Sequence, residues 1–431
     1  MCRLADARRQ PPRDHDPEMI GALSERTKPA VVGQPGLPAR ILTVHNTYQQ
    51  AGGEDLVFLE EAALLESHGH RVVCYEAHND RIQGMGRAEL VRDTIWNQRA
   101  CREIGELIRR ESPDVVHLHN TFPLISPAVA HAAAREGVPV VQTLHNYRLL
   151  CPNGLLFRGG QPCEQCLGRT LRWPGIVHGC YRGSRAATGA VAGMLLAHRA
   201  VGTWSRRVTA YIALSDFARR KFIEDGLPAG KVFVKPNFVA RDPGCGEGSG
   251  GYALFVGRLS PEKGVKTLLE AWKLLGGDAI PLKIAGDGPL SGEVSRAAAG
   301  GSRVEWLGHG SPQEIRALMK DATTLVFPSE WYETFGRVVI EAFAAGTPVL
   351  AAGTGAAAEL VEHGRTGLLF RTRDPADLAR LVRWLAHNPR EHARMRREAR
   401  EEYERRYTAE RNYELLIGIY RQAMEKVVAG S

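Results

Sequence analysis

The sequence lacks any long apolar run. The nearest approach, residues 186–197, is broken by Thr188, Gly189 and Gly193, and it is shorter than the ~18–20 residues that a membrane-spanning helix needs. We expect this stretch to form a buried helix instead. The N-terminus is charged and rich in proline, and it lacks the apolar segment of a signal peptide. A cytoplasmic protein is therefore expected.

Extremes of composition are also missing. Apolar residues make up 44% and charged residues 24% of the 431 positions, which excludes a mainly disordered or fibrous chain. The formal net charge is +8, and residues 145–225, with 12 Arg and Lys against 4 Asp and Glu, hold an excess of the same size. Such a basic stretch suits an anionic partner, namely phosphate, nucleic acid or an anionic membrane surface. Solvated arginines would explain it equally well.

Short β-rich runs alternate with helical stretches, which predicts an α/β fold of parallel sheets. The glycine-rich stretch 241–251 interrupts the alternation and is interpreted as a linker. We therefore predict two Rossmann-like, doubly wound parallel-sheet domains that face each other across a cleft. The expected parts are a disordered extension at 1–38, domains at 39–240 and 252–407, and a last helix at 408–431. Strands are expected at 40–45, 71–75, 115–118, 139–143, 209–213, 232–235, 252–256, 282–285, 304–307, 324–327, 348–351 and 367–370.

Two carboxylates, Glu333 and Glu341, stand eight positions apart. On one helix they would be about 12 Å apart at ~1.5 Å per residue, too far for a shared acid/base pair on one glycosidic bond. The spacing suits two hydroxyl-bearing rings on either side of a diphosphate. Amides of Thr334, Phe335 and Gly336 would meet that diphosphate at the helix N-terminus. A nucleotide sugar has this shape, although two ordinary glutamates on an exposed helix are the alternative that composition alone favours.

Three loops that follow predicted strands also suit phosphate. Arg258 and Lys263 in GRLSPEKG would neutralise a diphosphate at the carboxyl end of a strand. Gly286 and Gly288 in GDGP permit a tight turn against a ligand, and Gly53 opens the first helix of the first domain. Each loop alone is weak evidence for a ligand. The last is not a GxGxxG motif, so a dinucleotide site is not predicted there.

Histidines follow two strands of the first domain. His119 comes after the strand at 115–118, and His145 after the strand at 139–143. We expect both to point into the space between the domains, where one of them would bind the acceptor or handle a proton. A purely structural histidine is the alternative.

Together these motifs resemble the retaining nucleotide-sugar glycosyltransferases of family four, whose fold of two Rossmann domains is called GT-B. The stretch ETFGRVVIE matches the family's E-x7-E signature nearly residue for residue. GRLSPEKG, GDGP, LGH at 307–309 and AAGTPVLA at 344–351 fall in the family's order and spacing. The resemblance covers about residues 40–425, and the C-terminal half is its specific part.

The resemblance implies a role for each matching residue. Glu333 would contact the donor sugar, Glu341 the ribose hydroxyls, and Arg258 with Lys263 would clamp the diphosphate. His119 stands where the family often has an active-site histidine. Further donor-binding positions would be Gly53, Gly286, Gly288, Leu307, His309, Thr334, Phe335 and Gly336. No catalytic metal or other cofactor would be required, and the last helix would cross back onto the first domain.

One segment, residues 148–183, departs from the family pattern and shows no clear helix or strand. Such a segment is usually functional, or is held by something other than a core. Its cysteines are Cys151, Cys163, Cys166 and Cys180. Their spacing, C-x11-C-x2-C-x13-C, can form a structural zinc site with four thiolates, with His178 as a spare ligand. A disulfide and free thiols that pack as small hydrophobes are the alternatives.

The sequence therefore predicts a retaining hexosyltransferase that moves sugar from a nucleotide diphosphate sugar to a saccharide or lipid-linked acceptor. Envelope or exopolysaccharide synthesis is the expected context. The basic stretch and a lipid-linked acceptor together predict peripheral contact with the anionic inner face of the cytoplasmic membrane. Alternatives are another GT-B enzyme, such as a nucleotide-sugar epimerase, or a nucleotide-sugar-binding protein without catalysis. Nucleic acid is not an expected partner, because few stacking aromatics lie among the arginines.

Overall fold

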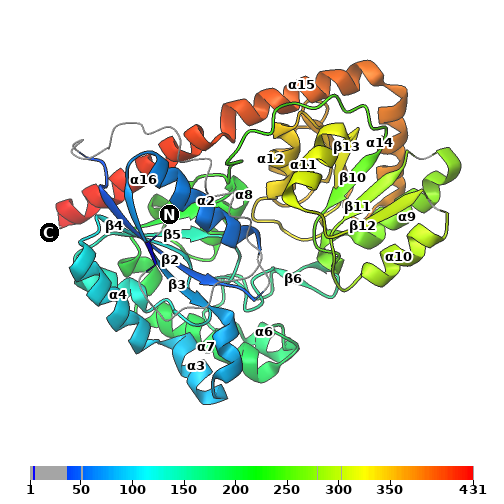
Figure 1. The fold of residues 1–431 in the computed structure, drawn as a ribbon. Helices are drawn as coiled ribbons and strands as arrows, with labels where there is room; N and C mark the ends of the chain where they lie inside the picture. Colours follow the sequence, from blue (N-terminus) through cyan, green and yellow to red (C-terminus); the bar gives the residue numbers. More distant parts are fainter. Residues whose placement is uncertain (1–2, 5–35, 50–51, 279, 302, 431) are drawn as a thin grey trace.

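The computed structural model describes residues 3–4, 36–49, 52–278, 280–301 and 303–430 (Figure 1). The chain forms two α/β domains, each built around a parallel sheet, as predicted. The first sheet has the order β1 (Arg3–Leu4), β3 (Arg71–His78), β2 (Arg40–Thr47), β4 (Val115–Asn120), β5 (Val140–Leu144), β8 (Ala210–Ala213) and β9 (Val232–Val234). The second has the order β12 (Val304–Gly308), β11 (Leu282–Ala285), β10 (Ala253–Val256), β13 (Thr324–Phe327), β14 (Val349–Ala352) and β15 (Gly367–Phe370).

Most of the expected extension, residues 1–38, lies outside the described residues. Within its described part, Arg3 and Leu4 pair with Val73 and Cys74 as a parallel edge strand. These two residues are therefore part of the first sheet. The sequence predicted no strand in this extension.

Helices cover both faces of the first sheet. They are α2 (Gly53–Ser67), α3 (Arg87–Ile95), α4 (Gln98–Glu111), α5 (Val129–Arg135), α7 (Arg185–Ala200) and α8 (Asp216–Glu224). Successive strand residues enter opposite cores, since Ile41 packs with Phe58 of α2 while Leu42 packs with Ile104 of α4. Residues 186–197, expected as a buried helix, lie within α7, whose Val191, Met194 and Leu195 are buried. In the described part of the chain, no helix is both long enough and apolar enough to cross a bilayer.

The second sheet is covered in the same way. Its helices are α9 (Val265–Leu275), α10 (Ser291–Ala299), α11 (Pro312–Asp321), α12 (Arg337–Ala344), α13 (Ala357–Leu360), α14 (Pro375–His387) and α15 (Pro389–Arg406). Leu254 and Phe255 of β10 enter opposite cores. This domain carries the loops that the sequence associates with a nucleotide sugar.

The last helix, α16 (Ala409–Gly430), leaves the second domain and lies beside the first (Figure 1). Leu416 and Tyr420 are buried there against Ile41 and Val141, and the Tyr420 hydroxyl is 2.8 Å from Nδ1 of His117. The end of the chain thus belongs to the core of the first domain and ties the two domains together.

The cysteine-containing segment is more regular than the sequence indicated. It holds a short hairpin, β6 (Phe157–Arg158) with β7 (Gln161–Pro162), and the helix α6 (Trp173–His178). Proline is tolerated in the first turn of a helix, so Pro174 does not prevent α6 from forming. Gly179, with φ +60°, then ends it in the left-handed conformation. The WPG sequence, interpreted as irregular, is therefore the start of a helix.

Candidate functional site

The loop before α12 carries the first predicted carboxylate. Glu333 is 6% exposed, and its Oε1 accepts hydrogen bonds from Lys263 Nζ at 2.6 Å and Ser329 Oγ at 2.7 Å. Lys263 lies in the loop that follows β10. Two residues that the sequence assigned separately, a sugar-contacting carboxylate and a diphosphate-binding cation, are thus an ion pair at one place.

The helix that follows this loop begins at Arg337, because Gly336 caps it with φ +107°. A Cβ at Gly336 would lie 3.0 Å from the Phe327 ring, so both the backbone angle and the close packing require glycine. Phe335 is 2% exposed and packs into the core. Of the predicted donor-binding positions, Phe335 could therefore contribute only its backbone.

The second predicted carboxylate, Glu341, lies on α12 and is about one-third exposed. Its Oε1 accepts from Arg337 Nε at 2.9 Å, and Arg337 Nη2 reaches Glu60 Oε1 on α2 at 2.7 Å. Arg337 therefore bridges the two domains through two carboxylates. No sequence motif marks Arg337, and its four-residue separation from Glu341 is the one local signal of this contact.

The Glu333 loop docks on the first domain. Thr334 Oγ1 donates to the carbonyl of His145 at 2.8 Å, and Ser215 Oγ donates to the carbonyl of Thr334 at 2.9 Å. The Tyr147 hydroxyl donates to the Glu333 carbonyl at 3.3 Å. The donor-side loop is thereby held against the carboxyl end of β5 and the segment that follows it. Sequence reasoning missed Tyr147 and Ser215, since no motif marks them.

The remaining predicted donor-binding loops meet at the carboxyl ends of β10, β11 and β12. A Cβ at Gly286 would lie 1.9 Å from the Gly257 carbonyl oxygen, and one at Gly288 would lie 2.5 Å from that of Leu259. Glycine at these positions is what lets the GDGP and GRLSPEKG loops touch. Arg258 is exposed beside them, and the end of β12 places half-buried Leu307 and exposed His309 nearby. Ligands of α/β domains bind at such an edge.

Gly53 is the first residue of α2 and is exposed. A Cβ built there meets no atom within 4 Å, so packing does not require glycine. The preceding amide, that of Gly52, already donates to Asp55 Oδ2 at 2.6 Å. Only part of the N-terminus is therefore available to a phosphate.

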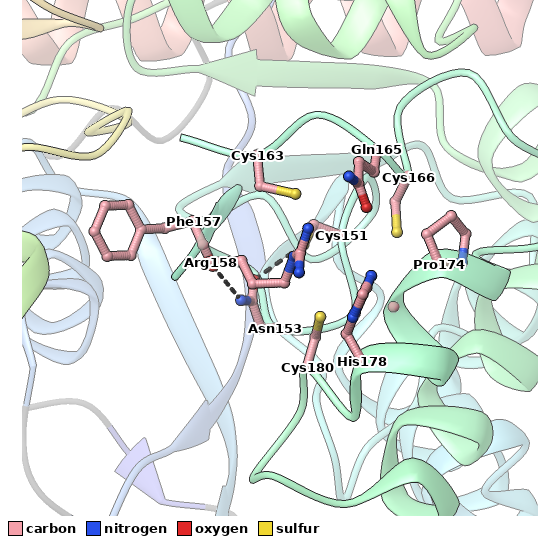
Figure 2. A pocket seen from close by; sticks show the side chains of 11 residues that line it. Cys151, Asn153, Phe157, Arg158, Cys163, Gln165, Cys166, Pro174, His178 and Cys180 are labelled. Carbon is pink, nitrogen blue, oxygen red and sulfur yellow. Dashed lines mark hydrogen bonds between the residues drawn. The ribbon is translucent and has the colours of Figure 1, made fainter. Parts of the chain in front are cut away.

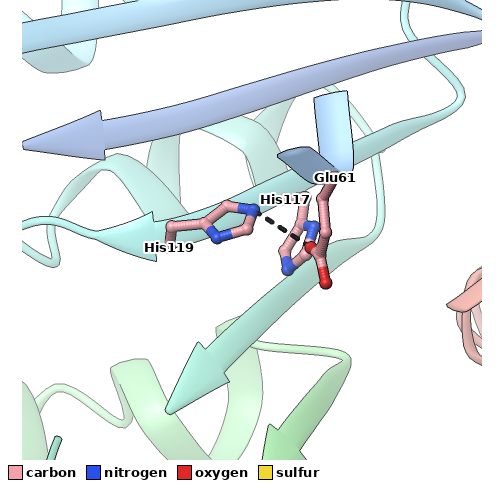
Figure 3. A group of neighbouring side chains, drawn as sticks. All are labelled: Glu61, His117 and His119. Carbon is pink, nitrogen blue, oxygen red and sulfur yellow. Dashed lines mark ion pairs between the residues drawn. The ribbon is translucent and has the colours of Figure 1, made fainter. Parts of the chain in front are cut away.

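His119 does not point into the space between the domains, and that expectation was wrong. Its side chain is fully buried, with Nδ1 3.1 Å from His145 Nε2. Its Nε2 lies 3.5 Å from Glu61 Oε2, the contact drawn in Figure 3. Burial, and then the neighbouring histidines, hold the pKa of His119 well below its usual value. His145, half-buried above it, is the histidine nearer to the Glu333 loop.

Glu61, His117 and His119 place three metal-ligating atoms close together (Figure 3), but His117 and Glu61 already have other partners. Both ring nitrogens of His117 are in hydrogen bonds, to Tyr420 and to Thr143. The ammonium of Lys235, itself fully buried, pairs with Glu61. A buried cation beside the carboxylate offsets its charge, so this cluster is a structural network.

The four cysteines of residues 148–183 line one cavity, together with His178 and Arg158 (Figure 2). All four thiols are free. Burial raises the pKa of the Cys166 thiol to about 11, and it also raises the pKa of Cys180.

The two parallel-sheet domains have the GT-B fold of glycosyltransferases, and the ion pair and the glycine loops lie at one edge of the second sheet. Residues 52–237 match the family described as glycosyl transferase 4-like domain, and residues 247–402 match glycosyl transferases group 1. The chain belongs to the group 1 glycosyltransferases, as the sequence motifs indicated.

Named relatives agree with this assignment. An uncharacterized glycosyltransferase of Methanocaldococcus jannaschii is 33% identical over 160 residues, which are 37% of this chain and 44% of that protein. The glycogen synthase of Mycobacterium tuberculosis is 30% identical over 308 residues, 67% of this chain and 64% of that one. The matches thus span less than two thirds of either relative. The crystal structure of Anabaena HepE in complex with UDP aligns with a TM-score of 0.62 at 20% identity, covering 90% of this chain and 100% of HepE.

Proposed function

We propose that the protein is a retaining glycosyltransferase that takes a hexose from a nucleotide diphosphate sugar and gives it to a saccharide or lipid-linked saccharide. The observation that carries the proposal is the ion pair between Glu333 and Lys263 at the edge where the glycine loops meet. A carboxylate for sugar hydroxyls and an ammonium for phosphate at the same place suit a sugar diphosphate.

In the proposed reaction the diphosphate leaves from the anomeric carbon, and the acceptor oxygen bonds to that carbon from the same face. The acceptor proton passes to the departing phosphate oxygen. Negative charge grows on the diphosphate in the transition state, and Arg258, Lys263 and the N-terminus of α12 stabilise it there. No step requires a metal ion. Glu341 on α12 would hold the ribose hydroxyls of the donor.

On the acceptor side, His145 is the side chain that we propose to contact the acceptor. His119, which contacts it from below at 3.1 Å, would act as a positioning residue that fixes the orientation of the His145 ring. Contact with the acceptor is therefore assigned to His145 and not to His119. The expected physiological context remains envelope or exopolysaccharide synthesis.

Donor binding tests this proposal through Glu341. Glu341→Ala should weaken binding of the nucleotide sugar by about 1.5–3 kcal/mol, the contribution of hydrogen bonds to a charged group, which is roughly a ten- to hundredfold rise in Kd. The fold should persist, because Arg337 keeps its contact with Glu60. Calorimetric titration of the wild type and the variant with a panel of nucleotide sugars measures this. Equal affinities would contradict the role of Glu341.

We further propose peripheral contact with an anionic membrane through α6. Leu171, Trp173 and Val177 are 43%, 50% and 49% exposed on and beside this helix, and the Arg169 guanidinium lies 5.3 Å from the centre of the Trp173 ring. Exposed aromatic and aliphatic side chains beside arginines are typical of a surface that inserts among charged lipid headgroups.

Co-sedimentation with vesicles tests the membrane contact. Binding to vesicles that contain anionic phospholipid should be strong at low salt and should fade at physiological ionic strength, where screening acts over roughly 8 Å. Trp173→Ser should reduce it severalfold, whereas Leu274→Ser, at an equally exposed position of the second domain, should not. Binding that neither lipid charge nor Trp173→Ser changes would leave α6 as ordinary surface.

A further inference from the structure

The cavity of the cysteine segment is built by three separate pieces of chain. Cys151 follows the turn after β5, Cys163 and Cys166 follow β7, and Cys180 follows α6. Figure 2 shows the side chains of Cys163, Cys166 and Cys180 directed into a common space. The cavity volume is about 10 Å³, close to the room that one water molecule or ion needs.

The four cysteines are less exposed than His178, the fifth candidate ligand. Cys151 and Cys166 are buried and the other two cysteines are half-buried, while His178 is exposed at the end of α6. All four cysteines and His178 line the cavity, and His178 is the most exposed of these five residues.

The charge that lines the cavity also suits a metal site with thiolate ligands. Arg158 reaches into it from the hairpin, and its Nε is buried without a hydrogen-bond partner. A buried charged donor without an acceptor is costly. Four thiolates around a divalent cation would carry a net charge of −2, and thiolate sulfurs would accept the N–H bond that Arg158 lacks.

We propose that Cys151, Cys163, Cys166 and Cys180 bind one structural zinc ion. Four thiolates are a common ligand set for structural zinc, and a closed set leaves no position for water or substrate. Arg158 offsets the charge of the site as a neighbouring donor. The proposal does not depend on the function proposed above.

Zinc binding requires the sulfurs to approach one another. Zn–S bonds of ~2.3 Å in a tetrahedron place the sulfurs about 3.8 Å apart. Among the residues that the structure describes, no three of these sulfurs lie within 4.8 Å of each other. Loading the site therefore contracts the segment around the ion, and this contraction can be measured as increased resistance to proteolysis.

The ion would rigidify a segment that touches the donor-binding loop. The Arg172 guanidinium, 2% exposed, donates to the carbonyls of Cys166 and Leu149 and pairs with Asp225 at 2.5 Å. Leu149 is two residues from Tyr147, whose hydroxyl reaches the Glu333 carbonyl. A zinc ion at the four cysteines would thus hold the acceptor side of the enzyme against the loop of Glu333.

Elemental analysis of the protein purified under reducing conditions tests the proposal. We expect about one zinc per chain, and cobalt that replaces it should give the intense absorption bands of tetrahedral cobalt thiolate. Cys163→Ser should lose most of the metal. Cys245→Ser, at an exposed free cysteine outside the segment, and His178→Ala should keep it.

A cysteine variant that fails to fold would not test the proposal. Removing the zinc from the wild-type protein with a chelator avoids this problem, because no residue is changed. Removing the zinc should expose residues 148–183 to limited proteolysis. A metal-free protein, cobalt spectra without thiolate bands, or zinc whose removal leaves protease resistance unchanged would each overturn the proposal. Loss of metal in His178→Ala would overturn the four-cysteine ligand set.

Discussion

Replacing Glu333 by glutamine is expected to lower turnover of the nucleotide sugar roughly 100- to 1,000-fold, the loss typical of one preorganised electrostatic contact. Glutamine keeps the shape of the side chain but removes the charge that holds Lys263 at 2.6 Å. The ammonium would then lose its fixed place at the diphosphate. Initial rates at saturating donor, with thermal unfolding as a check on the fold, measure the effect.

Glu330→Gln is the matched control. Glu330 lies in the same loop and is also partly buried, but it pairs with Thr267 at 2.6 Å and Arg373 at 3.2 Å. Its replacement should leave turnover within a few-fold of the wild type. If both variants lose activity equally, the loop is sensitive to any change, and a specific role of Glu333 is not supported.

The second large effect is expected from removing both cations of the GRLSPEKG loop. Arg258→Met with Lys263→Met keeps the apolar stems and removes two positive charges at the place where charge develops on the leaving diphosphate. We expect kcat to fall about 1,000-fold or more, with a smaller change in donor affinity. Single-turnover kinetics separate the two quantities.

Lys266→Met serves as the control for this loss of charge. Lys266 lies three residues beyond Lys263, is largely exposed, and meets Glu293 at 3.5 Å. Its replacement should be nearly neutral, because exposed ion pairs contribute little. A double Arg258 and Lys263 variant that turns over within a few-fold of the wild type would show that these residues do not clamp the diphosphate.

The fold was largely predictable because strands of a parallel sheet are buried on both faces and appear in the sequence as short apolar runs. The strands at 282–285, 324–327 and 367–370 were predicted with their observed bounds. Helix starts were less predictable. The start of α12 depends on Gly336, whose left-handed conformation moves the first helical residue to Arg337, and α6 depends on a proline that also signals turns.

The residues of the candidate site that lie in a single loop motif were predictable from the sequence. The contacts between the two domains were not. GRLSPEKG and ETFGRVVIE mark Lys263 and Glu333, but only folding shows that the two side chains are paired. The bridge from Arg337 to Glu60 joins residues 277 positions apart, and no local pattern encodes it. The burial of His119 depends on Glu61 and on Lys235, which comes from β9's end, so a strand-end position alone could not reveal it.

The most direct test of the account is the fate of the anomeric carbon. The wild-type protein is incubated with a panel of nucleotide diphosphate sugars and candidate saccharide acceptors, and the products are followed by NMR. We expect one donor to release its nucleoside diphosphate and to yield a sugar linkage, or a slowly hydrolysed sugar, with the anomeric configuration of the donor. A folded protein that turns over no nucleotide sugar, or a product of inverted configuration, would contradict it.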